Sequence, residues 1–491
     1  MGTDSGTQVK EGPRPDLLRI VLRNSLAVTA GEWATRVLNF GFTIYAVRLL
    51  GEAGFGRYAT VVAFVGLFGV FFELGMAQYV QRTIAQDRSK AQSLFWSMVT
   101  LRLVLAVLGV VIITSIAMLV GYEQSLVLGV LLYTSTFLLA AFLSPLTTVL
   151  TANERFDLWT VLQLLAQALN ALAGLTFLQM GFGFLGLLYT GFIVMPVHIA
   201  LAVWAIRRYH MGPLHFYLKP SAWPAFIRAC VPFGLSSVAL TYHFNADTVI
   251  LGLFHSQATV GWYNAAYRLV FNFISITSGF TGVITPSLAR EHQGNPERVR
   301  KWTRASIQGM VLFSLPISVG VFLLGPQIVR LLYGDAYAPA GPVLSLIIWD
   351  VPLMMFNSFC GNITTAVGLE RPASRIYLLS TAVGFSLYLL LIPTYGMIAA
   401  AGVTVLADSL TAVRFFLLLN KHMEIARVGQ KLVQTALAAA LMGGVVWLIG
   451  TFELPIVVAV GVVIYALLAF WFNLVNRPML TSVAQRLTQR Q

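Results

Sequence analysis

The chain has 491 residues, of which 57% are hydrophobic and 10% are charged, with a mean hydropathy of +0.78 and a net charge of +13. Soluble domains carry about 25% charged residues, so this composition excludes an ordinary water-soluble fold and indicates that lipid is the main solvent. Two cysteines give no disulfide framework, and the sequence lacks the GxxxxGK[ST] loop of a P-loop ATPase.

The polar first residues lack the apolar core and cleavage site of a signal peptide, which predicts a cytoplasmic tail over residues 1–23. The apolar runs that follow are about twenty residues long and lack the alternation of barrel strands. Lipid offers no partner for a backbone N–H or C=O group, so these runs predict an all-α membrane protein. About fourteen transmembrane helices are expected, over residues 24–48, 55–80, 92–119, 125–150, 158–179, 183–206, 226–252, 258–286, 305–325, 341–366, 373–393, 396–419, 431–450 and 454–475.

Two breaks between these runs carry local signals. The break Glu52–Phe55 is short and flanked by glycines, which predicts a tight helix hairpin. The break 288–304 contains Asn295-Pro296-Glu297, an N-cap followed by proline at the first helical position. It predicts a short amphipathic helix on the membrane surface.

The basic residues indicate the orientation. With the N-terminus in the cytoplasm, 26 of the 32 lysines and arginines lie in cytoplasmic segments, and only Arg48, Arg57 and Arg330 face outward. This asymmetry predicts that both termini are cytoplasmic. It also accounts for the net charge without a nucleic-acid partner.

Three pairs of short motifs recur in the same order and indicate an internal repeat. The pairs are Phe55–Ala59 with Val260–Asn264, Thr83–Asp87 with Ser287–Glu291, and Glu154-Arg155 with Glu370-Arg371. The repeat unit is six spans, so the two halves share their topology and predict a pair of pseudo-symmetric lobes with a cleft between them.

These patterns predict the organisation of the chain: an N-lobe of six helices, a cytoplasmic linker, a C-lobe of six helices, two further helices, and a cytoplasmic C-terminal tail. The predicted boundaries of these five parts are 24–206, 207–225, 226–420, 431–475 and 476–491.

The first span carries a polar stripe at spacings of three and four residues, which places its members on one helix face. They are Ser25, Thr29, Glu32, Arg36, Asn39 and Thr43. Glu32 and Arg36 can form an ion pair one turn apart. The stripe is either a hydrated surface or a buried polar seam against another helix.

The eighth span repeats the pattern with Asn264, Arg268, Asn272 and Ser275. Arg268 lies near the middle of the membrane and has no acid on its own face. A cation at this depth needs a partner, which is either an anionic ligand or an acid from another helix.

In the seventh span, His243 and Asp247 lie beside a neutral stripe that includes Asn245. A carboxylate within a span can bind H⁺ or Na⁺ and so couple ion binding to conformation. The alternative is that Asp247 pairs with Arg268 or caps a helix end. Asp350 and Asp408 are weaker candidates of the same kind.

Three other polar features have simpler interpretations. Arg102 lies nearer the cytoplasmic side of its span and is expected to extend its charge to the interface. Glu73 is expected to be structural. The neutral stripe of the fifth span, which includes Thr160 and Gln167, can bind sugar hydroxyls or join helices.

Four segments resemble a known family. Leu49–Tyr58 and Glu73–Met76 are similar to the first hairpin of the polysaccharide transport family, and Asn245–Gly252 with Val260–Tyr263 are similar to the start of its second lobe. This family of Wzx-type oligosaccharide flippases belongs to a superfamily with the multidrug extruders (MATE) and the lipid II flippases.

The resemblance implies a flippase that moves polyprenyl-diphosphate-linked oligosaccharides across the bacterial cytoplasmic (inner) membrane by alternating access. It implies a cationic central cavity, and Arg36 and Arg268 lie on the helices whose arginines would face it. The polar stripes add Glu32, Asn39, Asn264 and Asn272 as predicted substrate contacts. The implied partners are the lipid-linked oligosaccharide, membrane lipids, and the polysaccharide polymerase and export machinery.

Other functions remain as alternatives. An ion-coupled drug/cation antiporter of the same superfamily would need acids facing its cavity, whereas arginines lie on the first and eighth spans. A membrane glycosyltransferase or polymerase would need a large external loop, which the sequence lacks. A non-transporting scaffold would not need the polar stripes. We therefore expect no enzymatic activity, no catalytic residue, no cofactor and no metal site, apart from H⁺ or Na⁺ coupling through Asp247 and His243.

Overall fold

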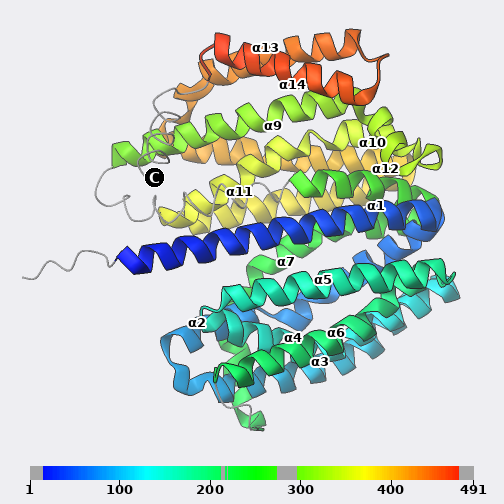
Figure 1. The fold of residues 1–491 in the computed structure, drawn as a ribbon, viewed down its shortest axis with the longest axis vertical. Coiled ribbons are helices and arrows are strands. Elements are labelled where there is room, and N and C mark those ends of the chain that lie inside the picture. The colour runs from blue at the N-terminus through cyan, green and yellow to red at the C-terminus, as the bar shows by residue number, and fades with distance from the viewer. Residues whose placement is uncertain (1–14, 212–215, 218, 274–295, 475–491) are drawn as a thin grey trace, which may run out of the picture. The chain divides into compact units, whose positions relative to one another are not determined.

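The computed structural model describes residues 15–211, 216–217, 219–273 and 296–474, and within these ranges it consists of helices without any strand (Figure 1). This confirms the all-α class. The helices are α1 (Pro15–Glu73), α2 (Met76–Gln86), α3 (Ala91–Leu119), α4 (Gln124–Ala152), α5 (Phe156–Gln179), α6 (Gly183–Arg208), α7 (Trp223–Phe254), α9 (Pro296–Tyr333), α10 (Ala340–Ile347), α11 (Asp350–Ala366), α12 (Glu370–Met423), α13 (Gly429–Leu448) and α14 (Leu454–Trp471). A further helix covers residues 257–273, and 3₁₀ turns cover Arg88–Lys90, Pro220–Ala222, Asp335–Tyr337 and Ile425–Val428.

Ten helical segments of the described chain are long and apolar enough to cross a membrane, so the protein is a multi-pass membrane protein. Two of them, Gly31–Gln86 and Glu370–Met423, are 56 and 54 residues long. One crossing takes about 20 residues, so each of these two segments is long enough for two crossings. The total of about fourteen spans stays a prediction.

Glycines divide the two longest helices. In α1, Gly51 has φ 66° and ψ 176°, and in α12, Gly396 has φ 58° and ψ −137°. Side chains with a Cβ atom are strained in these conformations, whereas glycine is not. Gly51 immediately precedes the predicted break at Glu52–Phe55, and Gly396 begins the predicted twelfth span. The helix direction therefore changes where the sequence predicts a boundary.

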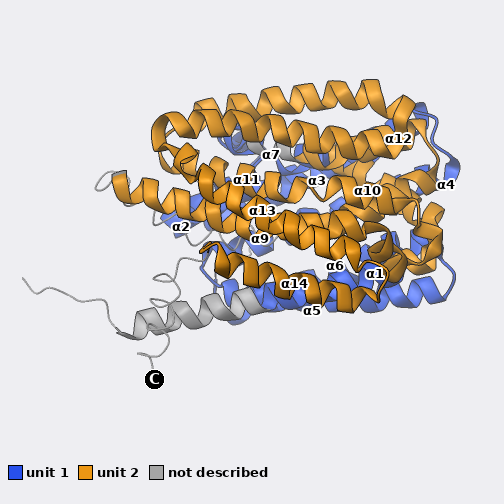
Figure 2. Ribbon diagram, turned by 90° about the horizontal axis from the view of Figure 1, so that it is seen from above, with its two compact units in different colours: residues 1–46, 68–238 blue, residues 47–67, 239–491 orange. Residues whose placement is uncertain are grey.

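The chain divides into two compact units (Figure 2). The first unit contains residues 1–46 and 68–238, and the second contains residues 47–67 and 239–491. Both α1 and α7 contribute residues to each unit. The lobe, linker and tail boundaries taken from the sequence stay predictions.

Within the first unit, the predicted second span ends earlier than expected. Leu74 and Gly75 have φ values of 43° and 72°, which interrupt the helix after Glu73 and start α2 at Met76. The sequence prediction extended this span to residue 80, because residues 74–80 are as apolar as a continuing helix. Nothing in an apolar stretch of sequence indicates that one of its leucines adopts the left-handed backbone conformation.

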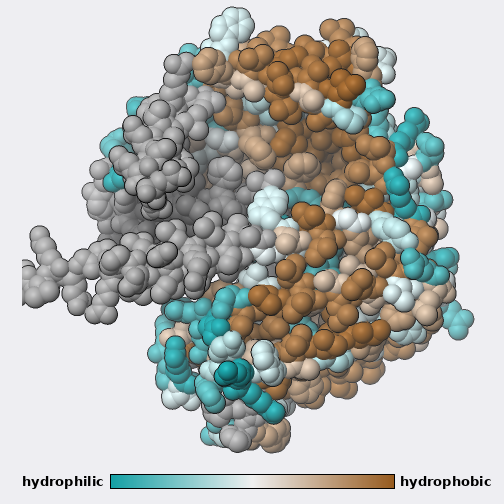
Figure 3. Space-filling view, in the orientation of Figure 1, coloured by the Kyte–Doolittle hydropathy of each residue, from teal (hydrophilic) through white to brown (hydrophobic). Residues whose placement is uncertain are grey.

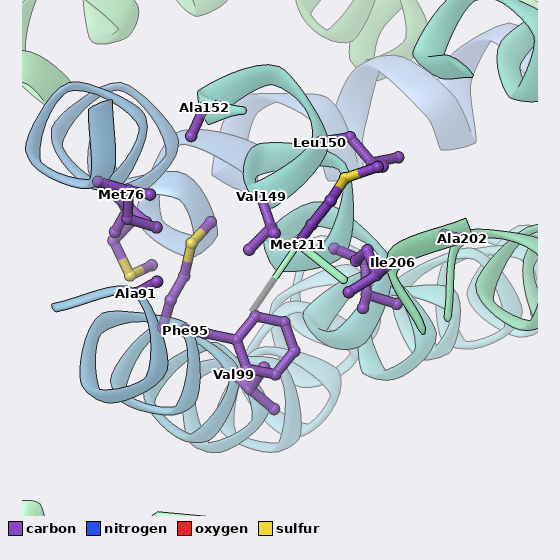
Figure 4. Close-up of a cluster of buried hydrophobic side chains, with 14 of the residues drawn as sticks. Met76, Ala91, Phe95, Val99, Val149, Leu150, Ala152, Ala202, Ile206 and Met211 are labelled. Carbon is purple, nitrogen blue, oxygen red and sulfur yellow. The ribbon is translucent and has the colours of Figure 1, made fainter. Parts of the chain in front are cut away.

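A buried apolar cluster in the first unit combines residues of α2, α3, α4 and α6 (Figure 4) with Leu162 of α5 and Phe226 and Cys230 of α7. Met76 and Val80 of α2 are one turn apart and belong to the same buried cluster as Phe95 of α3 and Leu150 of α4. Burying side chains of this size contributes about 1.5–3 kcal/mol each in water, but a membrane protein gains much of this stability from close packing rather than from leaving water.

Within the second unit, the structure describes α9 from Pro296, so the helix start predicted from the Asn-Pro-Glu motif stays a prediction. The expected short surface helix is wrong as a separate element, because α9 continues unbroken to Tyr333. No glycine or proline stands between the basic first turns and the apolar span that follows. The part of the predicted break before residue 296 lies outside the described residues.

The last two helices pack against α9. Val446 of α13 and Val457 of α14 are buried with Leu324 of α9. The opposite sides of α13 and α14 expose large apolar side chains, including Leu441 and Leu467, and Figure 3 shows apolar surface over this part of the protein. Such a surface is typical of helices in contact with lipid.

Candidate functional site

In the second unit, the first pair of repeated motifs meets at a helix crossing. Gly56 of α1 and Gly261 of the 257–273 helix lie against the partner backbone. A Cβ atom on Gly56 would overlap the carbonyl oxygen of Gln257, and one on Gly261 would overlap that of Glu52. Only glycine permits helices to approach this closely. One turn further, the Thr60 hydroxyl donates a hydrogen bond to the Gln257 side chain at 2.7 Å.

This crossing positions Arg268 two turns beyond Gly261. The Arg268 guanidinium lies 5.3 Å from the ring centroid of Phe55 and 5.6 Å from that of Tyr58, within the range of cation–π attraction. Among the described residues, no carboxylate lies within the 4.0 Å ion-pair distance of this guanidinium. The side chain is partly exposed. The two rings therefore hold the cation in place without neutralising it.

The asparagines on either side of Arg268 are fixed by local bonds. The side-chain amide of Asn272 donates to the Arg268 carbonyl at 2.7 Å, and that of Asn264 donates to the Val260 carbonyl at 3.0 Å. The side-chain oxygen of Asn264 also accepts a hydrogen bond from the Thr248 hydroxyl at 3.4 Å. The predicted polar face of this helix is thus ordered around Arg268.

The stripe of the first span lies in the first unit. Glu32 and Arg36 form the predicted ion pair, with a distance of 3.8 Å between the guanidinium and the carboxylate. The Arg36 guanidinium is also 5.7 Å from the Trp33 ring centroid. Glu32 and Asn39 are exposed, whereas Thr43 is buried, so the stripe passes from an accessible surface into the packed interior.

The neutral stripe of α5 contacts this face of α1. The Gln167 amide donates to the Asn39 side chain at 3.4 Å, and the Thr160 methyl group occupies the space beside Gly31. These contacts show that part of the α5 stripe joins helices.

The acid of the seventh span has partners that the sequence did not indicate. Asp247 is 1% exposed and accepts hydrogen bonds from the Tyr263 hydroxyl and from the Thr248 backbone N–H. The predicted alternatives for Asp247, pairing with Arg268 or capping a helix end, are therefore wrong. Tyr263 follows Asp247 by sixteen residues on the next helix, where the sequence gives no sign of a contact.

His243 faces a different acid. Its Nε2 atom lies 3.7 Å from a carboxylate oxygen of Asp408 on α12. Asp408, judged a weaker candidate from the sequence, is thus adjacent to one of the two residues predicted for ion coupling. Helical spacing pairs His243 with Asp247, but the fold directs the imidazole toward α12.

Arg102 does not extend to the interface as predicted. Its side chain is 8% exposed, forms an ion pair with Glu73 at 3.1 Å and donates to the Ser144 hydroxyl at 2.7 Å. The Glu73 carboxylate, 29 residues earlier in the chain, neutralises the Arg102 guanidinium within the first unit. The expected structural role of Glu73 is confirmed by this contact.

The predicted outward-facing arginines Arg48 and Arg330 form contacts in the second unit. Arg48 donates to the carbonyl oxygens of Leu331 and Leu332 at the end of α9, at 2.5 and 2.6 Å. Arg330 lies 3.7 Å from Asp335. An arginine on the last carbonyls of a helix also complements the helix dipole.

These observations define an all-α, multi-pass membrane protein with charged groups inside its helical units, as in transporters. A profile of the family described as "Polysaccharide biosynthesis protein" matches residues 46–342, and the chain belongs to this family. The family resemblance inferred from the hairpin and second-lobe motifs is confirmed.

Curated relatives have distant sequences. The chain is 21% identical over 247 residues to "Probable low-salt glycan biosynthesis flippase Agl15" of Haloferax volcanii, covering 49% of this chain and 52% of that protein. It is 22% identical to "Succinoglycan biosynthesis transport protein ExoT" of Rhizobium meliloti, covering 67% and 66%. The match thus spans about half the length of the first of these relatives and about two thirds of the second.

Solved structures share the fold. "Lipid II flippase MurJ, inward closed conformation" gives a TM-score of 0.78 at 13% identity, over 91% of this chain and 99% of that one. An inward-facing MATE family multidrug transporter gives 0.64 at 16% identity, over 81% and 96%.

Proposed function

We propose that this protein flips polyprenyl-diphosphate-linked oligosaccharides across the cytoplasmic membrane for the export of cell-surface polysaccharide. The binding site would open alternately to the two sides of the membrane, and both termini would be cytoplasmic. The family, the flippase and transport names of the relatives and the multi-pass helical fold support this proposal.

The observation that carries the proposal is the Arg268 site. A partly exposed guanidinium inside a membrane protein, held by Phe55 and Tyr58 and without a carboxylate partner among the described residues, is suited to an anionic ligand. A guanidinium presents five N–H donors in a planar fork that fits phosphate oxygens. We assign the diphosphate to Arg268.

The physical properties of this cargo explain why such a site is needed. Each unpaired glycan hydroxyl costs a few kcal/mol to bury in hydrocarbon, so the head group requires a polar path. Each CH₂ of the lipid tail gains about 0.8 kcal/mol from leaving water, so the tail stays in the bilayer. A flippase must therefore hold the charged junction between them.

The remaining candidate residues take secondary roles in this proposal. Arg36 has Glu32 as a partner, and its role as a second contact for the diphosphate stays a prediction. Asn39, Asn264 and Asn272 offer amide groups for sugar hydroxyls. The polymerase and export machinery stay predicted partners.

The test is transport by the purified full-length protein in liposomes that contain a polyprenyl-diphosphate disaccharide. An impermeant enzyme that oxidises the sugar would report how much substrate reaches the outer leaflet. Arg268→Ala should abolish flipping while the protein remains folded and membrane-inserted. The matched control is Arg330→Ala, because Arg330 is 63% exposed and outside the site. Normal flipping by Arg268→Ala would remove the diphosphate assignment.

One observation favours the second candidate, an ion-coupled drug/cation antiporter. The second unit buries Asp247, Asp350 and Asp408, and acids of this kind can attract organic cations. The same liposomes separate the two functions. An antiporter would move a cationic dye in exchange for protons and would leave the lipid-linked disaccharide in place.

A further inference from the structure

A cluster of charged side chains lies beside the first described turns of α9 in the second unit. Three guanidinium groups surround the carboxylate of Glu424, the residue that caps the end of α12. Nitrogen atoms of Arg300 and Arg304, both on α9, lie 3.8 and 3.4 Å from its oxygens. A nitrogen of Arg427, in the turn before α13, lies 2.8 Å from the same carboxylate. The cluster thus joins α9 to the turn between α12 and α13.

The positive charge of this cluster exceeds its negative charge. Arg300 also forms an ion pair with Glu297 at 2.7 Å, so two carboxylates face three guanidinium groups and one positive charge is left over. Neighbouring Lys301 is exposed and has no carboxylate within the 4.0 Å ion-pair distance among the described residues. Cations held this close repel one another, and a further anion among them relieves the repulsion.

The guanidinium groups also have hydrogen-bond donors that the cluster does not use. Each guanidinium carries five N–H donors. Arg304 donates from Nη2 to the Met423 carbonyl and the Glu424 carboxylate, whereas its Nε is buried and has no acceptor among the described residues. Arg427 contacts Glu424 through Nη2, and its side chain is 70% exposed. Open donors in a planar fork fit the oxygens of a phosphate group.

The backbone of Glu424 is in an unusual conformation. Its φ of 50° and ψ of 45° lie in the left-handed region, which residues with a Cβ atom rarely adopt. Glycine is the usual residue in this conformation at the end of a helix. Strained residues of this kind cluster at ligand sites, where the surrounding structure holds them in place. Here the strain places a carboxylate among three guanidinium groups.

The cluster lies at the depth of the membrane surface. The apolar helix α14 ends at Trp471, and just beyond this end the Gln308 side chain of α9 donates to the Leu474 carbonyl at 2.9 Å. Arg304 stands about one turn before Gln308. The first described turns of α9 project beyond the ends of α13 and α14 (Figure 1). The charge of Arg304 therefore lies where the apolar layer ends and the lipid head groups begin.

We propose that Arg300, Arg304 and Arg427 bind the phosphate group of an anionic phospholipid, and that Glu424 holds the three groups together when no lipid is bound. A phosphodiester carries one negative charge, which matches the one excess positive charge of the cluster. The acyl chains stay in the bilayer beside the apolar helices. The positive-inside rule predicts that this end of α9 is cytoplasmic, and anionic lipids of that leaflet attract basic residues. The inference does not depend on the cargo of the protein.

Lipid binding to the purified full-length protein in detergent micelles tests the site. The probe is phosphatidylglycerol, and native mass spectrometry counts the bound copies as its concentration rises. Replacing the two more accessible arginines together, Arg300→Ala with Arg427→Ala, should weaken binding about 30-fold, because each cation near an anionic lipid surface contributes about five-fold. Glu424→Gln should bind more tightly than the wild type, because it removes the competing charge and keeps the size of the side chain.

The matched control is Arg371→Ala with Arg375→Ala. These two arginines are exposed, lie one turn apart at the start of α12, and have no carboxylate within 4.0 Å in the part of the chain that the structure describes. The control loses the same charge as the double variant but keeps the cluster, so it should bind phosphatidylglycerol like the wild type. The lipid should also raise the free energy of unfolding of the wild type and the control, but not that of the double variant.

Equal affinity of the wild type and the double variant would overturn the site. An equal loss of affinity in the control would overturn it too, because the effect would then be a general attraction between charges. Glycerol phosphate is the soluble comparison: if it displaces phosphatidylglycerol at the same concentration, the site binds free phosphate groups and the lipid assignment falls. Weaker binding by Glu424→Gln than by the wild type would contradict the charge balance on which the proposal rests.

Discussion

The buried ion pair of Arg102 and Glu73 makes the clearest prediction about stability. Replacing Glu73 with leucine leaves the Arg102 guanidinium, 8% exposed, without its carboxylate. Removing one partner of a buried pair costs about 3–5 kcal/mol. Glu73 is 34% exposed and so partly screened by solvent, which places the expected loss at the lower end, about 3 kcal/mol.

The assay is the free energy of unfolding of the full-length protein, measured by titration with a denaturing detergent. The matched control is Asp157→Leu, which breaks the Arg155–Asp157 pair, whose side chains are 31% and 42% exposed. Exposed pairs contribute at most about 1 kcal/mol, so the control should lose far less stability.

A double variant tests the cause of the loss. Adding Arg102→Met to Glu73→Leu removes the unpaired charge, and replacing a buried pair with apolar residues is often neutral. The double variant should therefore recover most of the lost stability. A double variant as unstable as the single one, or a single variant no less stable than Asp157→Leu, would refute the reasoning.

Three further predictions concern the second unit and use the same unfolding assay. Gly261→Ala should destabilise by about 3 kcal/mol, the upper end for overpacking, because its Cβ would meet backbone; Gly309→Ala, with open space around it, should not destabilise. Tyr263→Phe should cost about 1.5–3 kcal/mol by removing a donor to buried Asp247, and an unchanged stability would contradict that bond. Arg48→Met should cost about 1 kcal/mol through its two lost bonds to α9 carbonyls, and no loss would show that these bonds contribute nothing.

Much of the fold could be predicted because it follows from composition and local signals. Long apolar runs in a chain with few charges require helices in lipid, whatever their neighbours are. Gly51 marks a boundary because its backbone conformation is one that glycine adopts without strain. The prediction failed where no local signal exists, as at the left-handed Leu74 and in the unbroken course of α9.

The candidate site was predictable only in part. Spacing along one helix placed Glu32 beside Arg36, and the structure confirms that contact. The aromatic neighbours of Arg268, Phe55 and Tyr58, lie on a helix about two hundred residues earlier in the chain. In the sequence they look like ordinary apolar residues of a membrane span, so nothing there predicts the contact. A contact between helices depends on their crossing, which sequence periodicity does not encode.

The central claim is that Arg268 holds the diphosphate of a lipid-linked sugar, and its most direct test is equilibrium binding of polyprenyl diphosphate to the full-length protein in nanodiscs. Losing a charge-assisted contact of about 1.5–3 kcal/mol should weaken binding by Arg268→Ala about 10- to 150-fold. Arg268→Lys should recover part of it, and uncharged polyprenol should bind wild type and variants alike. Equal affinity of wild type and Arg268→Ala for the diphosphate would contradict the claim.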